Sequence, residues 1–215
     1  MKHQVLVIGL GRFGGAAAKE LAALGHEVLA IDSLEERVND IAPDVTHALQ
    51  LDASDEAALK AAGAGEFEHA IVAITGHIEA SIFATMALRN LGVGNVIAKA
   101  ATSLHGSILE RVGASRVVYP EREVGVRLAH TFAIPNVLDY IDAGPGFAIA
   151  KIAPPPTFEG KSLSELSLPT RLSLTPIALR RGPKVTVNPH RDERIREGDE
   201  LVLIGRDEGL EKLAD

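Results

Sequence analysis

Hydrophobic positions in residues 1–118 fall into short runs without polar alternation, and each run is followed by a stretch with alanine-rich or amphipathic helical spacing. Runs that are apolar at every position are typical of strands covered on both faces. The repeated order of strand and helix therefore predicts a doubly wound parallel sheet of the Rossmann-like α/β class. The predicted strands are His3–Ile8, Glu27–Ile31, Val45–Gln50, Ala70–Ile74, Asn95–Ala98 and Arg116–Val118.

The pattern changes at Tyr119, where the sequence PEREVGVRLAHTF predicts a helix that begins at Pro120. The fixed φ of proline suits the first helical position, and Glu121 and Glu123 in the first turn complement the helix dipole. After Pro135, the sequence NVLDYI predicts one more short turn of helix, and the turn-rich AGPGF follows it. We interpret residues 119–143 as a linker between two domains.

Residues 144–215 predict a small α+β domain. The sequence SLSEL indicates a short helix, Arg181-Gly182-Pro183 indicates a hairpin turn, and a closing helix is expected from Asp207. A domain of this size buries little core, so we expect a partner or a second copy to stabilise it. The predicted strands are Phe147–Ile152, Leu174–Leu179, Lys184–Val187 and Leu201–Ile204.

Composition excludes several classes of function. The chain has 215 residues, a net charge of −7 and a pI near 5.6, which argue against a surface that binds nucleic acid or anionic lipid. The longest apolar runs are far shorter than the roughly 20 residues that span a bilayer, so a role at a membrane requires a protein partner. Cysteine is absent, which removes disulfides and thiolate chemistry, and the start of the chain is a poor secretory signal. We expect a cytosolic protein.

A glycine motif lies directly between the first predicted strand and the first predicted helix. Gly9, Gly11 and Gly14 form G-x-G-x-x-G, in which the glycines permit a tight turn, close approach of the backbone to a phosphate, and close packing of helix on strand. Asp32 ends the second strand about 20 residues later, where a carboxylate accepts ribose hydroxyls and repels the 2′-phosphate of NADP. The combination predicts an adenine nucleotide; the alternative is a glycine turn without a ligand.

Other candidates lie at the carboxyl edge of the same predicted sheet, where ligands of open α/β sheets bind. Arg12 in the loop either reaches phosphates or is a solvated loop residue. Asp52 follows the third strand and either lies near the adenine or begins a helix, although Ser54 is the better cap candidate. Thr75 follows the fourth strand, and Lys99 ends the fifth.

The sequence shows no reaction centre beside this site. A dehydrogenase needs an acid or base near the nicotinamide, yet neither Tyr119 nor Tyr140 has a lysine four residues on. The histidines are scattered, with His69 and His77 the closest pair in sequence, so no i,i+4 metal pair exists. Neither a nucleophile elbow nor a P-loop is present. We predict a nucleotide site without catalysis.

Several stretches together resemble one known family. They are VIGLGRFG with Asp32, LDAS, VAIT, VIAKA, ILERVGASRVVYPEREVG and the small domain that follows. They are similar to the RCK (regulator of potassium conductance) proteins, in particular to the KtrA- and TrkA-like cytosolic regulatory subunits of Ktr and Trk potassium transporters. The resemblance covers essentially the whole chain, and the junction GA-x-R-V-x-x-P-E is among its most specific parts.

The resemblance implies a nucleotide-binding lobe, crossover helices that dimerise, and a C-terminal domain. It also implies dimers that assemble into an octameric ring beneath a KtrB- or TrkH-like membrane subunit that translocates potassium, at the inner face of the cell membrane. Glu121 matches a family glutamate that helps to bind a divalent cation, Mg²⁺ or Ca²⁺, between the phosphates of two subunits; its alternative is the helix-start acid described above. The residues that the resemblance assigns to the nucleotide are Gly9, Gly11, Arg12, Phe13, Gly14, Asp32, Asp52, Ala53, Thr75 and Lys99.

The ligand that the ring senses stays open at this stage. ATP and ADP share every adenosine contact, so only the terminal phosphate can distinguish them. We predict that Arg12, together with a cation at Glu121, binds this terminal phosphate. The alternatives are an NAD(H)-sensing regulator of the Trk kind and an NAD-dependent oxidoreductase. Where some relatives carry an arginine for cyclic di-AMP, this chain has Pro169, with Arg171 nearby, so that ligand also stays open.

Overall fold

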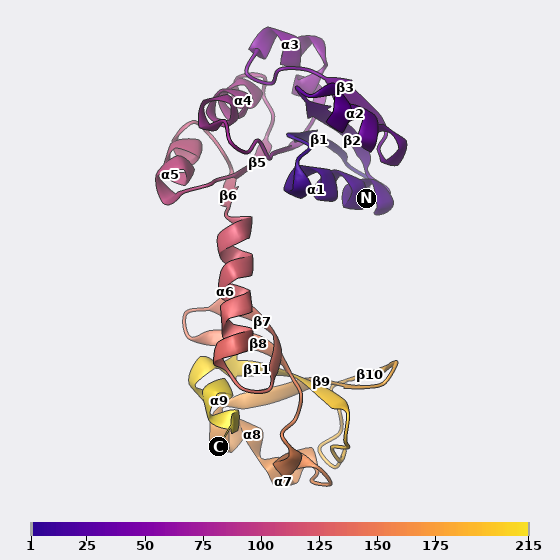
Figure 1. Ribbon diagram of the computed structural model, residues 1–215, viewed down its shortest axis with the longest axis vertical. Coiled ribbons are helices and arrows are strands. Elements are labelled where there is room, and N and C mark those ends of the chain that lie inside the picture. The colour runs from indigo at the N-terminus through magenta and orange to yellow at the C-terminus, as the bar shows by residue number, and fades with distance from the viewer. Residues whose placement is uncertain (1, 215) are drawn as a thin grey trace. The chain divides into compact units, whose positions relative to one another are not determined.

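The computed structural model describes residues 2–214 and divides into two compact units between Pro120 and Glu121. The first unit is built on a six-stranded parallel sheet in the order β3-β2-β1-β4-β5-β6 (Figure 1). The strand order reverses beside β1, which makes the neighbouring strands β1 and β4 the switch point of the sheet. The strands are β1 (Gln4–Ile8), β2 (Glu27–Asp32), β3 (His47–Gln50), β4 (His69–Val72), β5 (Asn95–Lys99) and β6 (Arg116–Val118).

Both faces of this sheet are buried along its central strands, as the apolar runs predict, while the edge strands β3 and β6 have no buried residue. Successive side chains of a strand point to opposite faces, so Leu6 and Ile8 of β1 join one apolar core while Val5 and Val7 join another. Leu59 and Leu88 bring α3 and α4 to the first core. The helices and 3₁₀ turns of this unit are α1 (Arg12–Ala23), α2 (Glu35–Ile41), η1 (Ala42–Asp44), α3 (Glu56–Ala61), η2 (Ala64–Glu66), α4 (Ile78–Asn90) and α5 (Ser103–Arg111).

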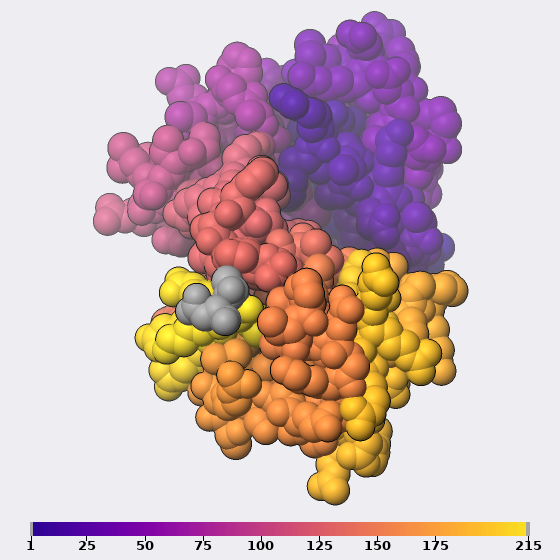
Figure 2. Space-filling model, turned by 60° about the horizontal axis from the view of Figure 1, so that its bottom comes forward, coloured from indigo at the N-terminus to yellow at the C-terminus, as the bar shows by residue number. Residues whose placement is uncertain are grey.

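The second unit carries an antiparallel sheet in the order β10-β9-β11-β8-β7. In the space-filling view the yellow end of the chain lies beside orange segments, in agreement with the pairing of β11 with β8 and β9 (Figure 2). The predicted hairpin turn at Arg181-Gly182-Pro183 is confirmed, because Arg181 pairs with Lys184. The elements are α6 (Pro120–Ala133), β7 (Val137–Gly144), β8 (Phe147–Ile152), η3 (Pro156–Phe158), α7 (Leu163–Leu166), α8 (Leu168–Leu172), β9 (Leu174–Arg181), β10 (Lys184–Val187), β11 (Asp199–Arg206), α9 (Asp207–Glu211) and η4 (Lys212–Ala214).

The short helical turn predicted for NVLDYI is wrong, and so is the interpretation of this stretch as part of a linker. These residues form β7, which pairs with β8, and AGPGF is the hairpin connection between the two strands rather than a boundary. Val137 and Tyr140 are buried in the core of the second unit while Leu138 is exposed. Pairing with β8 and this partial alternation of buried and exposed side chains explain why the segment forms a strand and not a helix.

None of the helices within residues 2–214 is long and apolar enough to cross a membrane.

Candidate functional site

The turn after β1 is shaped by two glycines that no other residue could replace without movement. Gly9 has a φ of +91°, in the left-handed region, and a Cβ there would lie 2.8 Å from the carbonyl carbon of Ala73. A Cβ on Gly14 would lie 1.9 Å from the carbonyl oxygen of Gly9. These two glycines therefore let the start of α1 pack directly on the ends of β1 and β4.

Gly11 has a different environment. Its φ is −66°, an ordinary value for any residue, and a Cβ built there meets no heavy atom within 4 Å. Gly11 is also the N-cap of α1, and the helix begins without a side-chain cap or an acidic residue in its first turn. The first N–H groups of a helix carry a partial positive charge of about one half. The open space beside Gly11 therefore fits a phosphate at a helix N-terminus.

Asp32 at the end of β2 is 5% exposed and holds the glycine turn in place. Its Oδ2 accepts the backbone N–H of Leu10 at 2.7 Å, and its Oδ1 accepts that of Leu34 at 2.9 Å. Arg37 of α2 donates to Oδ2 at 3.2 Å. A carboxylate has about four acceptor sites, so these contacts leave about one for a ribose hydroxyl. Sequence reasoning missed Arg37; a basic residue five positions after the aspartate, in the first turn of the next helix, was the available signal.

Thr75, Lys99 and Phe13 are brought together by the ends of β4, β5 and α1. Lys99 is 6% exposed, and its Nζ lies 3.5 Å from Thr75 Oγ1 and 5.8 Å from the centre of the Phe13 ring. A lysine nitrogen over an aromatic face is attracted by the ring's electrons. The cation of Lys99 thus lies against the glycine turn, close to the start of α1.

Asp52 and Ala53 follow β3 beside the end of β2, to which Leu51 is joined by a hydrogen bond from its amide to the Asp32 carbonyl. The side chain of Asp52 accepts the backbone N–H of Ser54 at 3.0 Å and its hydroxyl at 2.7 Å, which lowers the pKa of the Asp52 carboxyl. Both predicted caps of the next helix are wrong, because Asp55 caps α3 by accepting the N–H groups of its first turn. Ala53 is buried.

The remaining candidates lie on the surface. Arg12 is exposed, and its side chain makes no hydrogen bond or ion pair with residues 2–214. Glu121 and Glu123 are exposed in the first turn of α6, in the second unit, so the cation role of Glu121 stays a prediction. Pro169 and Arg171 are both exposed in or beside α8.

Comparison with known proteins adds an independent observation. Residues 5–120 match the TrkA-N domain and residues 147–215 match the TrkA-C domain. The Ktr system potassium uptake protein A of Bacillus subtilis (strain 168) is 37% identical over 209 residues, which are 97% of this chain and 94% of that protein. The matches confirm the predicted family resemblance.

Solved structures agree on the fold. The RCK domain of GsuK superimposes with a TM-score of 0.69 at 19% identity, covering 98% of this chain and 46% of that chain. The GsuK channel bound to NAD superimposes with a TM-score of 0.69 at 19% identity, covering 99% of this chain and 39% of that chain. This chain therefore spans less than half the length of either structure, and the likeness confirms the predicted fold class.

Proposed function

We propose, since the chain belongs to the family of proteins with a TrkA-N and a TrkA-C domain, that it is a nucleotide-binding regulatory subunit of a Ktr-type potassium transport system. The Bacillus relative named for potassium uptake matches it almost from end to end. The observation that carries the nucleotide role is the open space beside Gly11 at the uncapped start of α1, the helix whose Phe13 ring lies under the amine of Lys99. An NAD-dependent oxidoreductase is not proposed, because no acid or base pairs with this site in the sequence.

We assign ATP and ADP as the sensed ligands. The turn at Gly9, Gly11 and Gly14 would hold phosphates, Phe13 would flank them, and Asp32 would accept a ribose hydroxyl. Asp52 and Ala53 would lie beside the adenine, with Thr75 and Lys99 closing the edge formed by β4 and β5. A bound nucleotide supplies negative charge and a ribose for these contacts. This chain supplies a preformed turn and the positively charged side chains of Arg12 and Lys99.

Discrimination between the two nucleotides requires a group that reaches the terminal phosphate. A ligand shifts a two-state protein only by its differential affinity for the two states. Arg12 is the candidate, since its exposed guanidinium is not committed to any residue within 2–214 and stands at the first position of α1. Glu121 would contribute to a divalent cation, Mg²⁺ or Ca²⁺, shared by the phosphates of two subunits.

Assembly into dimers, and of dimers into a ring, is supported by the surface of α6. None of the residues of this helix is buried, although several are large and apolar. Apolar side chains gathered on one helix mark an interaction surface when they stay uncovered in a single chain. They are Val124, Val126, Leu128 and Phe132, which are 60%, 47%, 55% and 84% exposed. We propose that the ring acts on a membrane subunit that translocates potassium, at the inner face of the membrane.

Calorimetric titration of the full chain with ATP, ADP and NADH, each with and without Mg²⁺ or Ca²⁺, tests this function. We expect ATP and ADP to bind at one site per chain, and the cation to strengthen ATP binding more than ADP binding. Tight binding of NADH without binding of ATP would replace the ATP/ADP sensor by an NAD(H)-sensing regulator. Consumption of NADH with a small carbonyl substrate would contradict a regulatory role.

A further inference from the structure

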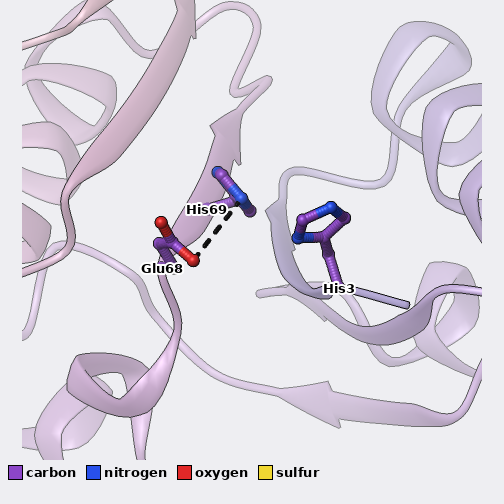
Figure 3. A group of neighbouring side chains, drawn as sticks. All are labelled: His3, Glu68 and His69. Carbon is purple, nitrogen blue, oxygen red and sulfur yellow. Dashed lines mark ion pairs between the residues drawn. The ribbon is translucent and has the colours of Figure 1, made fainter. Parts of the chain in front are cut away.

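Two histidines and a glutamate meet at the amino edge of the parallel sheet, opposite the edge that carries the glycine turn. His3 directly precedes β1, while Glu68 and His69 stand at the start of β4 (Figure 3). The parallel pairing of β1 with β4 places His69 beside Val5, two residues after His3. Sequence spacing hid this cluster, because only the register of two strands distant in sequence brings His3 and His69 together.

The distances within the cluster suit a small cation. One ligand atom from each of His3, Glu68 and His69 lies within 4.8 Å of the other two, and His69 Nε2 is 3.9 Å from Glu68 Oε2. A tetrahedral Zn²⁺ ion with bonds of about 2.0–2.1 Å holds its ligand atoms about 3.4 Å apart. The side chain of Glu68 is 78% exposed and can therefore move by the ångström or so that closure requires.

Neighbouring side chains hold the backbone of His3 and the imidazole of His69. His26 Nδ1 accepts the backbone N–H of His3 at 3.1 Å, which fixes the start of the chain against the sheet. The side-chain amide of Asn95, at the start of β5, lies 3.2 Å from His69 Nδ1. This leaves His69 Nε2 directed toward Glu68. Metal-binding histidines usually donate their other N–H to an oxygen, and the Asn95 amide offers one when it is turned over.

We propose that His3, Glu68 and His69 form a binding site for a divalent transition-metal ion, with Zn²⁺ as the best fit. Imidazole and carboxylate are both good Zn²⁺ ligands, and three protein ligands leave a fourth position for water. Ca²⁺ and Mg²⁺ prefer six or more oxygen ligands, which this cluster does not provide. The site is independent of the nucleotide: it ties the first residues of β1 to β4, at the other end of the strand that leads into the glycine turn.

Titration of the tag-free full chain with ZnCl₂, followed by calorimetry and by thermal unfolding, tests the site. We expect one Zn²⁺ per chain and a rise in melting temperature, because an ion that binds only the folded state stabilises it. His3→Gln and His69→Gln should each weaken Zn²⁺ binding by at least about tenfold. Asn95→Ala, which removes only the orienting amide, should weaken it by roughly tenfold while keeping one site per chain.

His190→Gln is the matched control, since His190 also lies beside a carboxylate, with its Nδ1 3.4 Å from Asp192 Oδ2. This variant should bind Zn²⁺ as the unchanged chain does. Absence of Zn²⁺ binding by the unchanged chain would overturn the proposal. Zn²⁺ binding that His190→Gln weakens as much as His69→Gln does would also overturn it, because the ion would then bind exposed histidines in general.

Discussion

The two units of this chain use buried polar groups in different ways. In the first unit the apolar cores fill both faces of the sheet, and Asp32 and Lys99 are buried at its carboxyl edge, where they hold the glycine turn. In the second unit the buried carboxylate of Asp199 on β11 accepts two hydrogen bonds from Arg181 on β9. The buried carboxylate of the first unit bonds the backbone of the glycine turn, whereas that of the second unit joins two strands of its own sheet.

The nucleotide site that we propose lies in the first unit. A helix start without a side-chain cap or an acidic residue in its first turn suits an anion, and α1 begins in this way directly after the glycine turn. Both units carry exposed apolar residues, among them Leu104 in the first unit and Ile141 and Phe147 on strands of the second. The charge networks of the second unit link β9 to β11 within its sheet.

Replacing Gly14 should have the largest effect on the first unit. Because a Cβ at Gly14 would overlap the carbonyl oxygen of Gly9, Gly14→Ala should lower the free energy of unfolding by about 3 kcal/mol and abolish nucleotide binding. Gly11→Ala is the matched control, since its Cβ meets no protein atom. It should change stability by about 0.5 kcal/mol and still weaken nucleotide binding at least about tenfold.

Urea unfolding of both glycine variants, with calorimetric titration of ATP, measures the two effects separately. Full ATP affinity in Gly11→Ala would contradict the assignment of the space beside Gly11 to a phosphate. A stability of Gly14→Ala equal to that of the unchanged chain would contradict the packing role of that glycine.

A change at Asp199 should destabilise the second unit and spare the nucleotide site. The side chain of Asp199 is fully buried and also accepts the backbone N–H of Arg196 at 2.9 Å. Asp199→Asn should cost about 2–3 kcal/mol, because the Arg181 guanidinium loses its buried carboxylate partner and retains only the more exposed Glu193. Asp192→Asn, whose carboxylate is exposed, should cost less than about 0.5 kcal/mol. Urea unfolding measures both, and a lower ATP affinity in Asp199→Asn would contradict the division of roles.

Smaller effects are expected from pH, because the two units should lose stability in different pH ranges. His105 joins α5 to α4 through a 2.8 Å hydrogen bond with Ser81, and burial lowers the pKa of its imidazole. As the pH falls, this imidazole is therefore protonated in the unfolded chain before it is protonated in the folded chain. The stability of the first unit should therefore fall as pH decreases below the ordinary value of 6.5. Hydrogen bonds from Arg180 and Lys151 lower the pKa of Glu200 to about 2, so its contribution to the second unit is lost between pH 4.5 and 2.

Hydrogen exchange of peptides from each unit, measured at pH 7.5, 5.5 and roughly 3.5, resolves the two ranges. We expect α4 and α5 to lose protection by pH 5.5 in the unchanged chain but less so in His105→Gln. Loss of protection in β8, β9 and β11 should begin only below pH 4.5. The reverse order would contradict the pKa shifts of these two groups.

Local patterns were sufficient to predict most of the fold, because the central strands of the first unit carry short apolar runs and glycine marks the turn after β1. They failed at Val137–Gly144, where a short apolar stretch after Pro135 suits either a helix or a strand and only pairing with β8 decides. The contact of Lys99 with Phe13 and the meeting of His3 with His69 also depend on strand order and register. Sequence spacing does not contain that information.

The central claim is that Arg12 reads the terminal phosphate of a nucleotide held at the glycine turn. The most direct measurement is the ratio of ATP to ADP affinity in Arg12→Ala and in the unchanged chain, by calorimetry in the same buffer and salt. Lys19→Ala, on the same helix but paired with Asp44, is the control for loss of a positive charge. We predict that Arg12→Ala lowers the ratio by about tenfold while Lys19→Ala leaves it unchanged. An unchanged ratio in Arg12→Ala would contradict the claim.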